Sequence, residues 1–416
     1  MKIFRKSICA LSALAISTGA AVAGGFSTEG VNPGGALFND KSLVVQGALG
    51  YVMPKRRYKN GVGTTGFGGL PGPPVGLVYP GTTSSSDAAN NYLLLSGDLK
   101  FRVNQEIDCA LRVHEPYAID QEVSPNYAGR FYRTSQLIES VGIDGTCSYK
   151  FAIDDRSRVR ILAGVRSTDL KYDRTNDLLF GALLTPAGLL VADGSNNYDA
   201  KGDRGYGYRI GASYEIPEIA LRAQIIYDSA IDLDASGTQT LIIAANPLRP
   251  AGTTVLPITA SVEMPQSISA RFQTGVNETT LVYAGVRWMD WSVLKTLNVI
   301  GGLAGPGGVT TLDNGYSDGW TFDTGVQKKL TEQLSASLGF KWNSGIGGGY
   351  TDTWGLSAGV AYDLDDNWRL SFGGGATLLT SSNEFNTLSS TGATTFHKQP
   401  NDWAFTLGTR LQYAID

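Results

Sequence analysis

Alternation of apolar with small or polar side chains, residue by residue, constrains this chain more than any other feature. In the segment 354–362 the even positions hold Trp, Leu, Ala, Val and Tyr, whereas the odd positions hold Gly, Ser, Gly and Ala. Segments 334–342 and 403–413 repeat the pattern. Because successive side chains of a strand point to opposite faces, the pattern predicts strands with one apolar face.

Aromatic rings stand at or near the ends of these segments. They are Trp288, Trp320, Trp342, Trp354, Tyr362, Trp368, Trp403 and Tyr413. A soluble sandwich would also alternate, but rings at strand ends are typical of the two aromatic girdles of a membrane barrel. The apolar face is therefore expected to meet lipid.

Fourteen segments carry the strand pattern. They are 42–53, 91–103, 107–116, 135–152, 157–169, 205–215, 219–230, 266–275, 279–291, 319–329, 334–342, 354–363, 367–376 and 403–413. Six short turns alternate with seven long loops, as an even-stranded barrel with both termini in the periplasm requires. The sequence predicts an all-β fold, a 14-stranded antiparallel transmembrane β-barrel over residues 41–416.

The first 23 residues have the features of a secretory signal peptide. Lys2, Arg5 and Lys6 precede a mainly apolar run that closes with Ala21-Val22-Ala23, which predicts a mature chain from Gly24. Removing the signal leaves 31 basic against 38 acidic residues, a net charge near −7. That charge disfavours nucleic acid as a partner. The barrel is expected in the bacterial outer membrane.

Catalytic signals are absent from the sequence. It has two histidines: His114 is interpreted as a polar lumen residue and His397 as a solvated loop residue. No nucleophile elbow, phosphate loop or metal-ligand motif occurs, so we expect no enzyme activity, cofactor or metal.

Two of the long loops are unusually apolar. The third spans about 170–204 and the fourth about 231–265. Apolar surface facing water is unfavourable, by about 25 cal/mol per Å². The loops are expected either to cover the barrel mouth against each other or to hold an apolar ligand. The candidate ligand-binding residues are Leu179, Phe180, Leu183, Leu184, Leu189, Leu190, Leu241, Ile242 and Ile243.

Alternation also assigns charged side chains to the lumen. They are Arg112, Arg158, Arg160, Arg166, Arg209, Arg222, Arg271 and Arg287, together with Asp108, Asp144, Asp228 and Asp323. Mutual ion pairs are one interpretation, and attraction of a ligand carboxylate is the other. Cys109 and Cys147 fall on one face of adjacent strands, so they either form a disulfide or remain two buried thiols.

Several short motifs, in order along the chain, resemble those of the outer-membrane long-chain fatty acid and hydrophobic compound transporters (the FadL/TodX type). The resemblance covers nearly the whole mature chain. The motifs are Asn32-Pro33, Pro116-Tyr117-Ala118, Ala128-Gly129-Arg130-Phe131-Tyr132, Gly205-Tyr206-Gly207-Tyr208, Met264-Pro265 and Trp288-Met289-Asp290-Trp291-Ser292.

The resemblance implies a monomeric barrel with an N-terminal plug, loop helices that capture ligand, and a kinked third strand that opens the wall sideways. Pro116 is the candidate for the kink, with plain strand termination as the alternative. Residues 24–40 would form the plug, which is short for the family. The chain ends on Asp416 rather than on an aromatic residue, so the usual signal for the barrel-assembly machinery is altered.

The function expected from these features is passive uptake of hydrophobic molecules such as long-chain fatty acids, captured by the apolar loops. A general porin for small polar solutes is the second hypothesis, and a structural or adhesive surface barrel is the third. Expected partners are a hydrophobic small molecule, outer-membrane lipids, lipopolysaccharide and the barrel-assembly machinery.

Overall fold

The computed structural model describes residues 25–65, 77–78, 81–85, 88–185, 188–245, 250–388 and 393–416. The expected signal peptide lies outside this part of the chain. Among the described residues no helix is both long and apolar enough to cross a bilayer.

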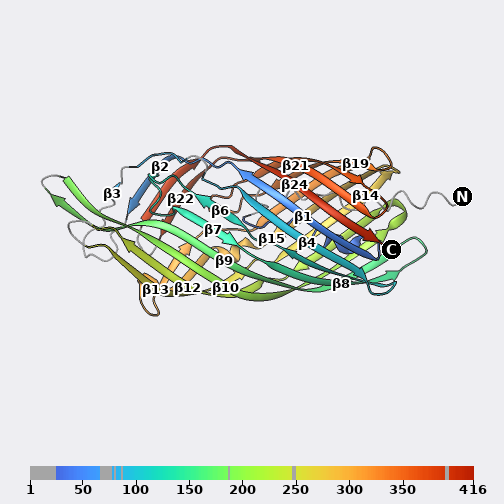
Figure 1. Cartoon of the computed structure of the whole chain (residues 1–416), viewed down its shortest axis with the longest axis horizontal. Coiled ribbons are helices and arrows are strands. Elements are labelled where there is room, and N and C mark those ends of the chain that lie inside the picture. Colours follow the sequence, from blue (N-terminus) through green and yellow to red (C-terminus); the bar gives the residue numbers. More distant parts are fainter. Residues whose placement is uncertain are drawn as a thin grey trace.

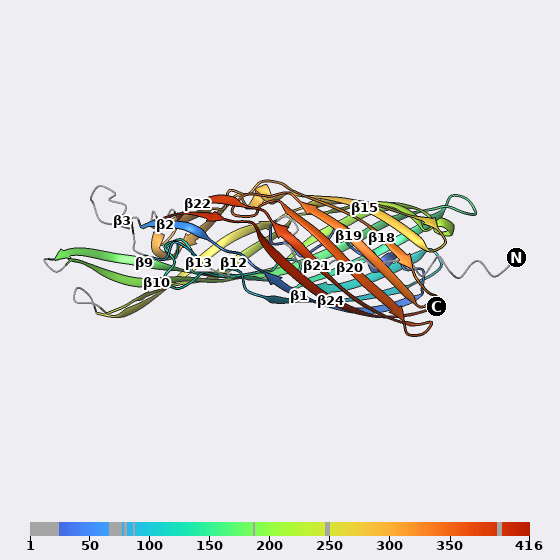
Figure 2. The ribbon, with the colours of Figure 1, turned by 90° about the horizontal axis from the view of Figure 1, so that it is seen from above.

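Fourteen antiparallel strands form a closed ring, each pairing with the next and the last with the first (Figures 1 and 2). They are β1 (Leu43–Pro54), β4 (Tyr92–Arg102), β5 (Ile107–His114), β8 (Gly142–Ala152), β9 (Arg158–Thr185), β10 (Gly188–Ile216), β11 (Leu221–Asp228), β14 (Ser267–Asn277), β15 (Thr280–Met289), β18 (Gly319–Lys329), β19 (Leu334–Asn343), β20 (Thr353–Asp363), β21 (Trp368–Leu379) and β24 (Asp402–Ile415). Pairing of β1 with β24 closes the ring, which removes the unpaired edges that lipid would not tolerate. The predicted 14-stranded barrel is confirmed.

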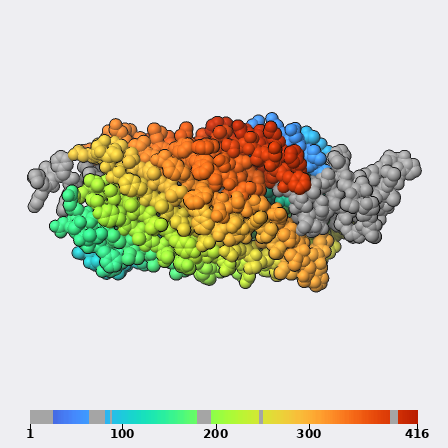
Figure 3. All heavy atoms as spheres, turned by 180° about the vertical axis from the view of Figure 1, so that it is seen from behind, coloured from blue at the N-terminus to red at the C-terminus, as the bar shows by residue number. Residues whose placement is uncertain are grey.

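The outer face of the ring is apolar. Trp354, Leu356 and Val360 of β20 are 45%, 69% and 44% exposed, whereas Ala361 on the opposite face is 1% exposed. The other strands of the ring also direct apolar side chains outward. Strands from successive parts of the chain lie side by side around the barrel (Figure 3). An apolar belt outside and polar side chains inside are the arrangement of an outer-membrane barrel.

Ten further strands continue the wall beyond the ring, and we call this extension the crown. They are β2 (Lys59–Thr65), β3 (Leu77–Val78), β6 (Ile119–Glu122), β7 (Ser135–Glu139), β12 (Ile231–Ile243), β13 (Gly252–Met264), β16 (Thr296–Gly301), β17 (Val309–Asp313), β22 (Ser382–Leu388) and β23 (Ala393–Gln399). The long hairpin of β9 and β10 projects through the ring into the crown, where β7 pairs with β9 and β12 pairs with β10 (Figure 1).

Two expectations from the sequence are wrong for the residues that form the crown. The segments expected as long loops are largely strands, and the loop helices implied by the resemblance do not occur in the described residues. Helical structure there consists of short 3-10 turns at Gly35–Phe38 (η2), Pro217–Ile219 (η3), Trp291–Leu294 (η4) and Gly302–Ala304 (η5). The segment 135–152, expected as one strand, is split at Ser140–Val141 because β7 pairs with β6 and β9, while β8 pairs with β5.

Residues 25–40, the N-terminal segment, lie inside the lumen. Leu37 and Phe38 of η2 pack against Leu162 of β9, and Phe26 joins the largest buried apolar cluster of the molecule. The fit is close at Gly25, where an added Cβ would lie 2.7 Å from the Trp291 indole. Its backbone also has a φ of 73°, which favours glycine.

Candidate functional site

An apolar cavity of about 80 Å³ lies inside the molecule where the ring meets the crown. The residues that line it share apolar or aromatic side chains, and most come from β7, β9, β10, β13, β16 and β17, with Phe26 of the N-terminal segment and Tyr316 of the segment that follows β17. They include Phe26, Ile138, Leu170, Tyr172, Tyr198, Ile258, Val262, Met264, Leu297, Val299, Leu312 and Tyr316. An apolar space with few polar groups is suited to a hydrophobic ligand.

Side chains alternate between the two faces of each strand, and this alternation determines which residues line the cavity. Along β13, Ile258, Val262 and Met264 are buried inside, while Ser261 and Glu263 face water. The apolar face is thus the inner one, opposite to the membrane strands. Sequence reasoning assigned 231–265 to a loop and missed these residues, although their period of two was a signal for them.

The residues predicted to capture ligand lie farther along the hairpins. Leu241 and Ile243 are buried and Ile242 is 49% exposed, near the tip of the β12–β13 hairpin. Leu183 pairs with Leu190, and Leu184 pairs with Leu189, at the tip of β9–β10. The side chains of 179–193, Phe180 among them, lie outside the described part. Of the two loop sets, no described side chain named above lines the apolar cavity.

Many ion pairs lie in the lumen below the apolar cavity. Arg160 contacts Asp108 at 3.1 Å and Glu215 at 3.0 Å, and Arg209 contacts Asp228 at 2.6 Å. The predicted lumen arginines also form the pairs Arg112–Asp98, Arg158–Glu215, Arg158–Asp40, Arg166–Glu29, Arg166–Asp144, Arg166–Asp228, Arg209–Asp144, Arg271–Asp323 and Arg287–Glu29. The structure places these arginines on the inner face, engaged with acids of the chain itself.

Arg222 differs from the other lumen arginines. Its guanidinium lies 4.2 Å from the centre of the Phe38 ring and donates a 2.9 Å hydrogen bond to Gln273. This cation therefore packs against the N-terminal segment through a cation–π contact.

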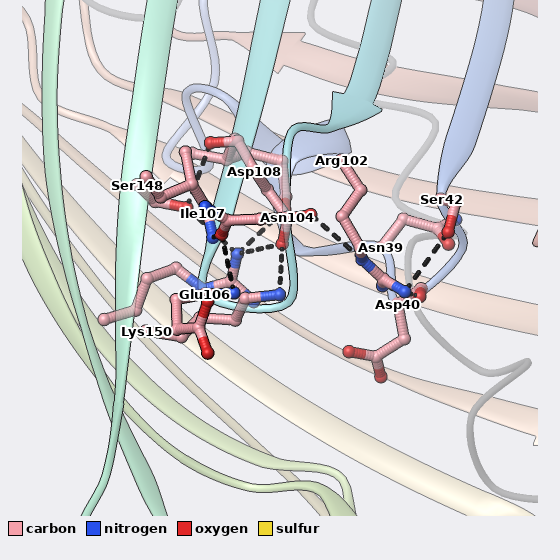
Figure 4. A network of polar contacts seen from close by, with 12 residues as sticks. Asn39, Asp40, Ser42, Arg102, Asn104, Glu106, Ile107, Asp108, Ser148 and Lys150 are labelled. Atoms are coloured by element: carbon pink, nitrogen blue, oxygen red, sulfur yellow. Dashed lines mark hydrogen bonds and ion pairs between the residues drawn. The ribbon is translucent and has the colours of Figure 1, made fainter.

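Glu29 fastens the N-terminal segment to this network. Its carboxylate is 5% exposed, accepts a 2.8 Å bond from Arg287 and lies 3.3 Å from Arg166. At the periplasmic end, the Arg102 guanidinium donates to the Asp40 carbonyl and to Ser42, and it also approaches Asp108 (Figure 4). The segment is thus anchored at both ends by arginines of the wall.

Glu29, His114 and Asp144 offer three ligand atoms within 4.8 Å of one another. Arg166 approaches both carboxylates, and Arg287 and Arg209 each contact one of them. A metal cation there would meet three like charges, so the cluster is an ion-pair network rather than a metal centre.

The hydrogen-bond ladder of the wall has a gap beside β4. The ladder between β4 and β5 begins only at Ser96 and His114, while Tyr92–Leu95 pairs with β1 alone in the described part. The chain then leaves the ring, forms β6 and β7 and returns at β8. A cavity of about 470 Å³ lies at this gap, and we call it the wall opening. It is lined by Tyr92, Leu93, Glu115, Ala118, Ile119, Asp120, Leu137, Ile138, Glu139, Ser140, Val141, Asp169, Leu170, Lys171 and Lys201.

Residues 115–118 turn inward at this opening. The Pro116 carbonyl accepts a 2.9 Å bond from the amide of Thr28, and the Ala118 amide donates to Phe26 at 3.1 Å. Proline has no amide hydrogen to offer β4. The segment that leaves the wall is therefore paired with the N-terminal segment instead of with its neighbouring strand.

A disulfide joins Cys109 of β5 to Cys147 of β8, with the Cα atoms 4.0 Å apart. The cysteines share the outer face with Leu111 and Val113. The chain leaves β5 after His114 and returns at Gly142 of β8, and the cross-link joins these same two strands five register positions from that pair.

His397 contradicts its expected solvated position. It is 3% exposed, lies 2.9 Å from Glu384 and packs against the Tyr58 ring at 4.1 Å between centroids. The reason is that β22 and β23 form a hairpin of the crown wall that pairs with β2, which turns His397 inward.

Several solved structures have a fold similar to that of this chain. A FadL homologue from Pseudomonas aeruginosa matches with a TM-score of 0.73 and 17% identity, over 96% of this chain and 98% of that chain. The toluene transporter TbuX from Ralstonia pickettii matches with a TM-score of 0.59 and 15% identity, over 90% of each chain. The toluene transporter TodX from P. putida gives 0.57 and 13%, again over 90% of each. At these identities the likeness shows the fold.

A search of curated protein sequences finds no match. The family model for outer membrane transport proteins of the OMPP1/FadL/TodX group, however, matches residues 3–345, which is most of the chain. The family and the fold together place the protein in the bacterial outer membrane as a transport protein rather than an enzyme. The chain belongs to the OMPP1/FadL/TodX family of outer membrane transport proteins.

Proposed function

We propose that the protein takes up hydrophobic molecules such as long-chain fatty acids by passive diffusion, through the apolar cavity and out of the wall opening. The observation that carries this proposal is that the apolar cavity and the wall opening share two lining residues. Ile138 and Leu170 line both the apolar cavity and the wall opening. A ligand in the cavity is thus separated from the opening by two apolar side chains.

Energetics support the lateral route. An apolar ligand gains about 25 cal/mol for each Å² of its surface that leaves water. Continuing down the lumen would take it into the ion-pair layer around Glu29 and Arg166, where it could replace none of the hydrogen bonds. The lining of the wall opening instead includes Leu93 and Val141, apolar side chains that are 55% and 44% exposed, beside charged ones such as Asp169 and Lys171.

A porin for polar solutes has less support. A space of about 200 Å³ does lie beside the N-terminal segment, where Gly339, Gly355 and Gly408 leave the inner wall uncovered. Glu29, which itself lines that space, nevertheless anchors the segment through its ion pairs with Arg166 and Arg287. We propose that the N-terminal segment acts as the plug of the lumen and that loops three and four capture the ligand.

The test is saturable binding of a fluorescent long-chain fatty acid to the refolded barrel. Ala260→Trp fills the apolar cavity from β13, and Ser261→Trp, on the opposite and exposed face, is the matched control. Binding lost in Ala260→Trp and kept in Ser261→Trp is expected. Absence of saturable binding to the unsubstituted protein would remove the fatty-acid assignment.

A further inference from the structure

Two lysines face each other on the outer face of the crown. Lys59 of β2 pairs directly with Lys398 of β23, and both side chains are exposed. Like charges directly opposite each other on neighbouring strands are unfavourable. Within the part of the chain that the structure describes, neither lysine forms an ion pair with a carboxylate. The described chain therefore does not relieve the repulsion between them.

A second pair of opposed lysines shows a different arrangement. Lys171 and Lys201 pair directly across β9 and β10, and Glu139 of β7 lies 3.1 Å from Lys171. There the protein itself supplies an acid that offsets the like charges. Because the described residues place no such acid beside Lys59 and Lys398, that pair is suited to an anion from outside the protein.

An apolar row lies next to the pair formed by Lys59 and Lys398. Val62 pairs with Phe396, and Phe396 pairs with Phe385 of β22. These three side chains are 45%, 41% and 69% exposed, in that order. Residues two apart along a strand lie about 7 Å from each other, which places Phe396 beside Lys398. We call the lysine pair and the apolar row together the outer crown patch.

A β-bulge keeps both rows on the outer face. Lys59 and Val62 are three positions apart on β2, and their partners on β23, Lys398 and Phe396, are two positions apart. In a regular strand, residues three positions apart point to opposite faces. Asn60, which lies within this register shift, has a positive φ of 54°. The bulge at Asn60 thus directs a lysine and a valine to the same side.

The outer crown patch stands just outside the membrane. Trp403 of β24, 48% exposed, belongs to the aromatic girdle that marks the boundary of the acyl chains. Lys398 precedes Trp403 by five residues, a span of at most about 18 Å. β2 and β22 lie at the end of the barrel opposite the C-terminus, which is the extracellular end (Figure 1). There the barrel meets the outer leaflet, whose lipopolysaccharide carries phosphates and sugars just outside its acyl chains.

We propose that the outer crown patch binds lipopolysaccharide, with Lys59 and Lys398 on its phosphates and the two phenylalanines against its sugar rings. A phosphate attracts both ammonium groups and so offsets their mutual repulsion. Exposed apolar side chains beside polar ones are typical of an interaction surface. The patch lies outside the lumen, so this site does not depend on which molecule passes through the barrel.

The test is binding of rough-type lipopolysaccharide to the refolded full-length barrel in detergent with EDTA, followed by native mass spectrometry. The comparison ligand is the same lipopolysaccharide after its phosphates are removed with hydrofluoric acid. Lys59→Gln with Lys398→Gln removes both cations. Lys398→Glu places an acid opposite Lys59, which favours pairing of β2 with β23 while it removes the phosphate site, so it separates a lost cation from a misfolded crown.

The matched control is Lys328→Gln with Lys329→Gln, which removes two cations from the periplasmic end of β18. The unsubstituted protein and this control should bind intact lipopolysaccharide roughly tenfold more tightly than the dephosphorylated form. Both lysine variants of the patch should lose roughly tenfold in affinity for the intact form, the order expected for two exposed ion pairs, and bind the two forms alike. Phe385→Ser with Phe396→Ser should weaken binding of both forms equally.

Unchanged binding in the lysine variants of the patch would overturn the proposal. Equal losses in the control at β18, or equal affinity of the unsubstituted protein for the two forms, would also overturn it. Dimers of the lipopolysaccharide-free barrel that disappear in Phe385→Ser with Phe396→Ser would assign the patch to a second copy of the chain instead.

Discussion

Glu29→Gln is the substitution that tests how the N-terminal segment is held. The Glu29 carboxylate is 5% exposed, 2.8 Å from Arg287 and 3.3 Å from Arg166. Without it, Arg287 keeps only Ser267 and the Gly30 carbonyl, whereas Arg166 retains Asp144 at 3.6 Å and Asp228 at 3.7 Å. Breaking a buried ion pair costs about 3–5 kcal/mol. Because Arg166 keeps two acids, we expect the low end of that range.

The lost free energy weakens docking of the N-terminal segment and leaves the stability of the barrel strands unchanged. Residues 25–40 lie outside the hydrogen-bonded ring, so the ladders of the fourteen strands are unaffected. A loss of about 3 kcal/mol should weaken docking roughly a hundredfold. Hydrogen exchange followed by mass spectrometry should show amides of 26–39 exchanging roughly a hundredfold faster, with the barrel strands unchanged.

The matched control is Glu218→Gln. Glu218 pairs with Arg156 at a turn where the two side chains are 52% and 73% exposed, so its loss should leave exchange of the segment unchanged. Unchanged exchange of 26–39 in Glu29→Gln would refute the reasoning, as would faster exchange spread over the whole barrel.

Two further predictions concern the wall and the hairpin tips. Cys109→Ser should lower the unfolding free energy by about 2–4 kcal/mol, measured by denaturant titration in detergent; Cys147→Ser and the double variant should match it, and additive losses would contradict a disulfide. Leu183→Asp with Ile242→Asp should reduce initial binding of a fluorescent fatty acid, because the proposed capture loops would then carry charge. Unchanged binding kinetics in that double variant would count against capture by these loops.

The ring was predictable because lipid imposes one rule on every strand. Side chains that face acyl chains are apolar, and those that face the lumen are mostly polar. Each membrane strand therefore alternates apolar side chains outside with polar ones inside. On β9, Ile161 and Val165 face outward at 51% and 60% exposed, while Arg160 and Arg166 face inward. All fourteen predicted segments contain strands of the ring.

The apolar cavity was not predictable by that rule, because the phase reverses along the same strand. Leu170, on the inner side of β9, is 9% exposed, and Tyr172 beside it lines the cavity. Beyond the membrane the outer face meets water, so polar residues move outside and apolar residues inside. A period-two analysis that looks for a change of phase would have found this boundary between Val165 and Leu170.

The polar parts of the site depend on pairing between distant segments. Glu29 meets Arg287 across 258 positions, and Arg57 meets Asp402 across 345. His397 was expected in water because the sequence placed it in a long loop, and only its pairing in the crown shows that it is buried. Alternation predicts the side of a strand on which a charge lies, but not its partner.

The most direct test of the account is the uptake rate of a fluorescent fatty acid by cells whose barrel carries Ile138→Trp. Ile138 separates the apolar cavity from the wall opening, whereas Ile143, 44% exposed on the lipid-facing side of β8, provides the control Ile143→Trp. The account predicts strongly reduced uptake in Ile138→Trp and normal uptake in Ile143→Trp, at equal amounts of folded barrel. Normal uptake in Ile138→Trp would contradict passage from the cavity through the wall.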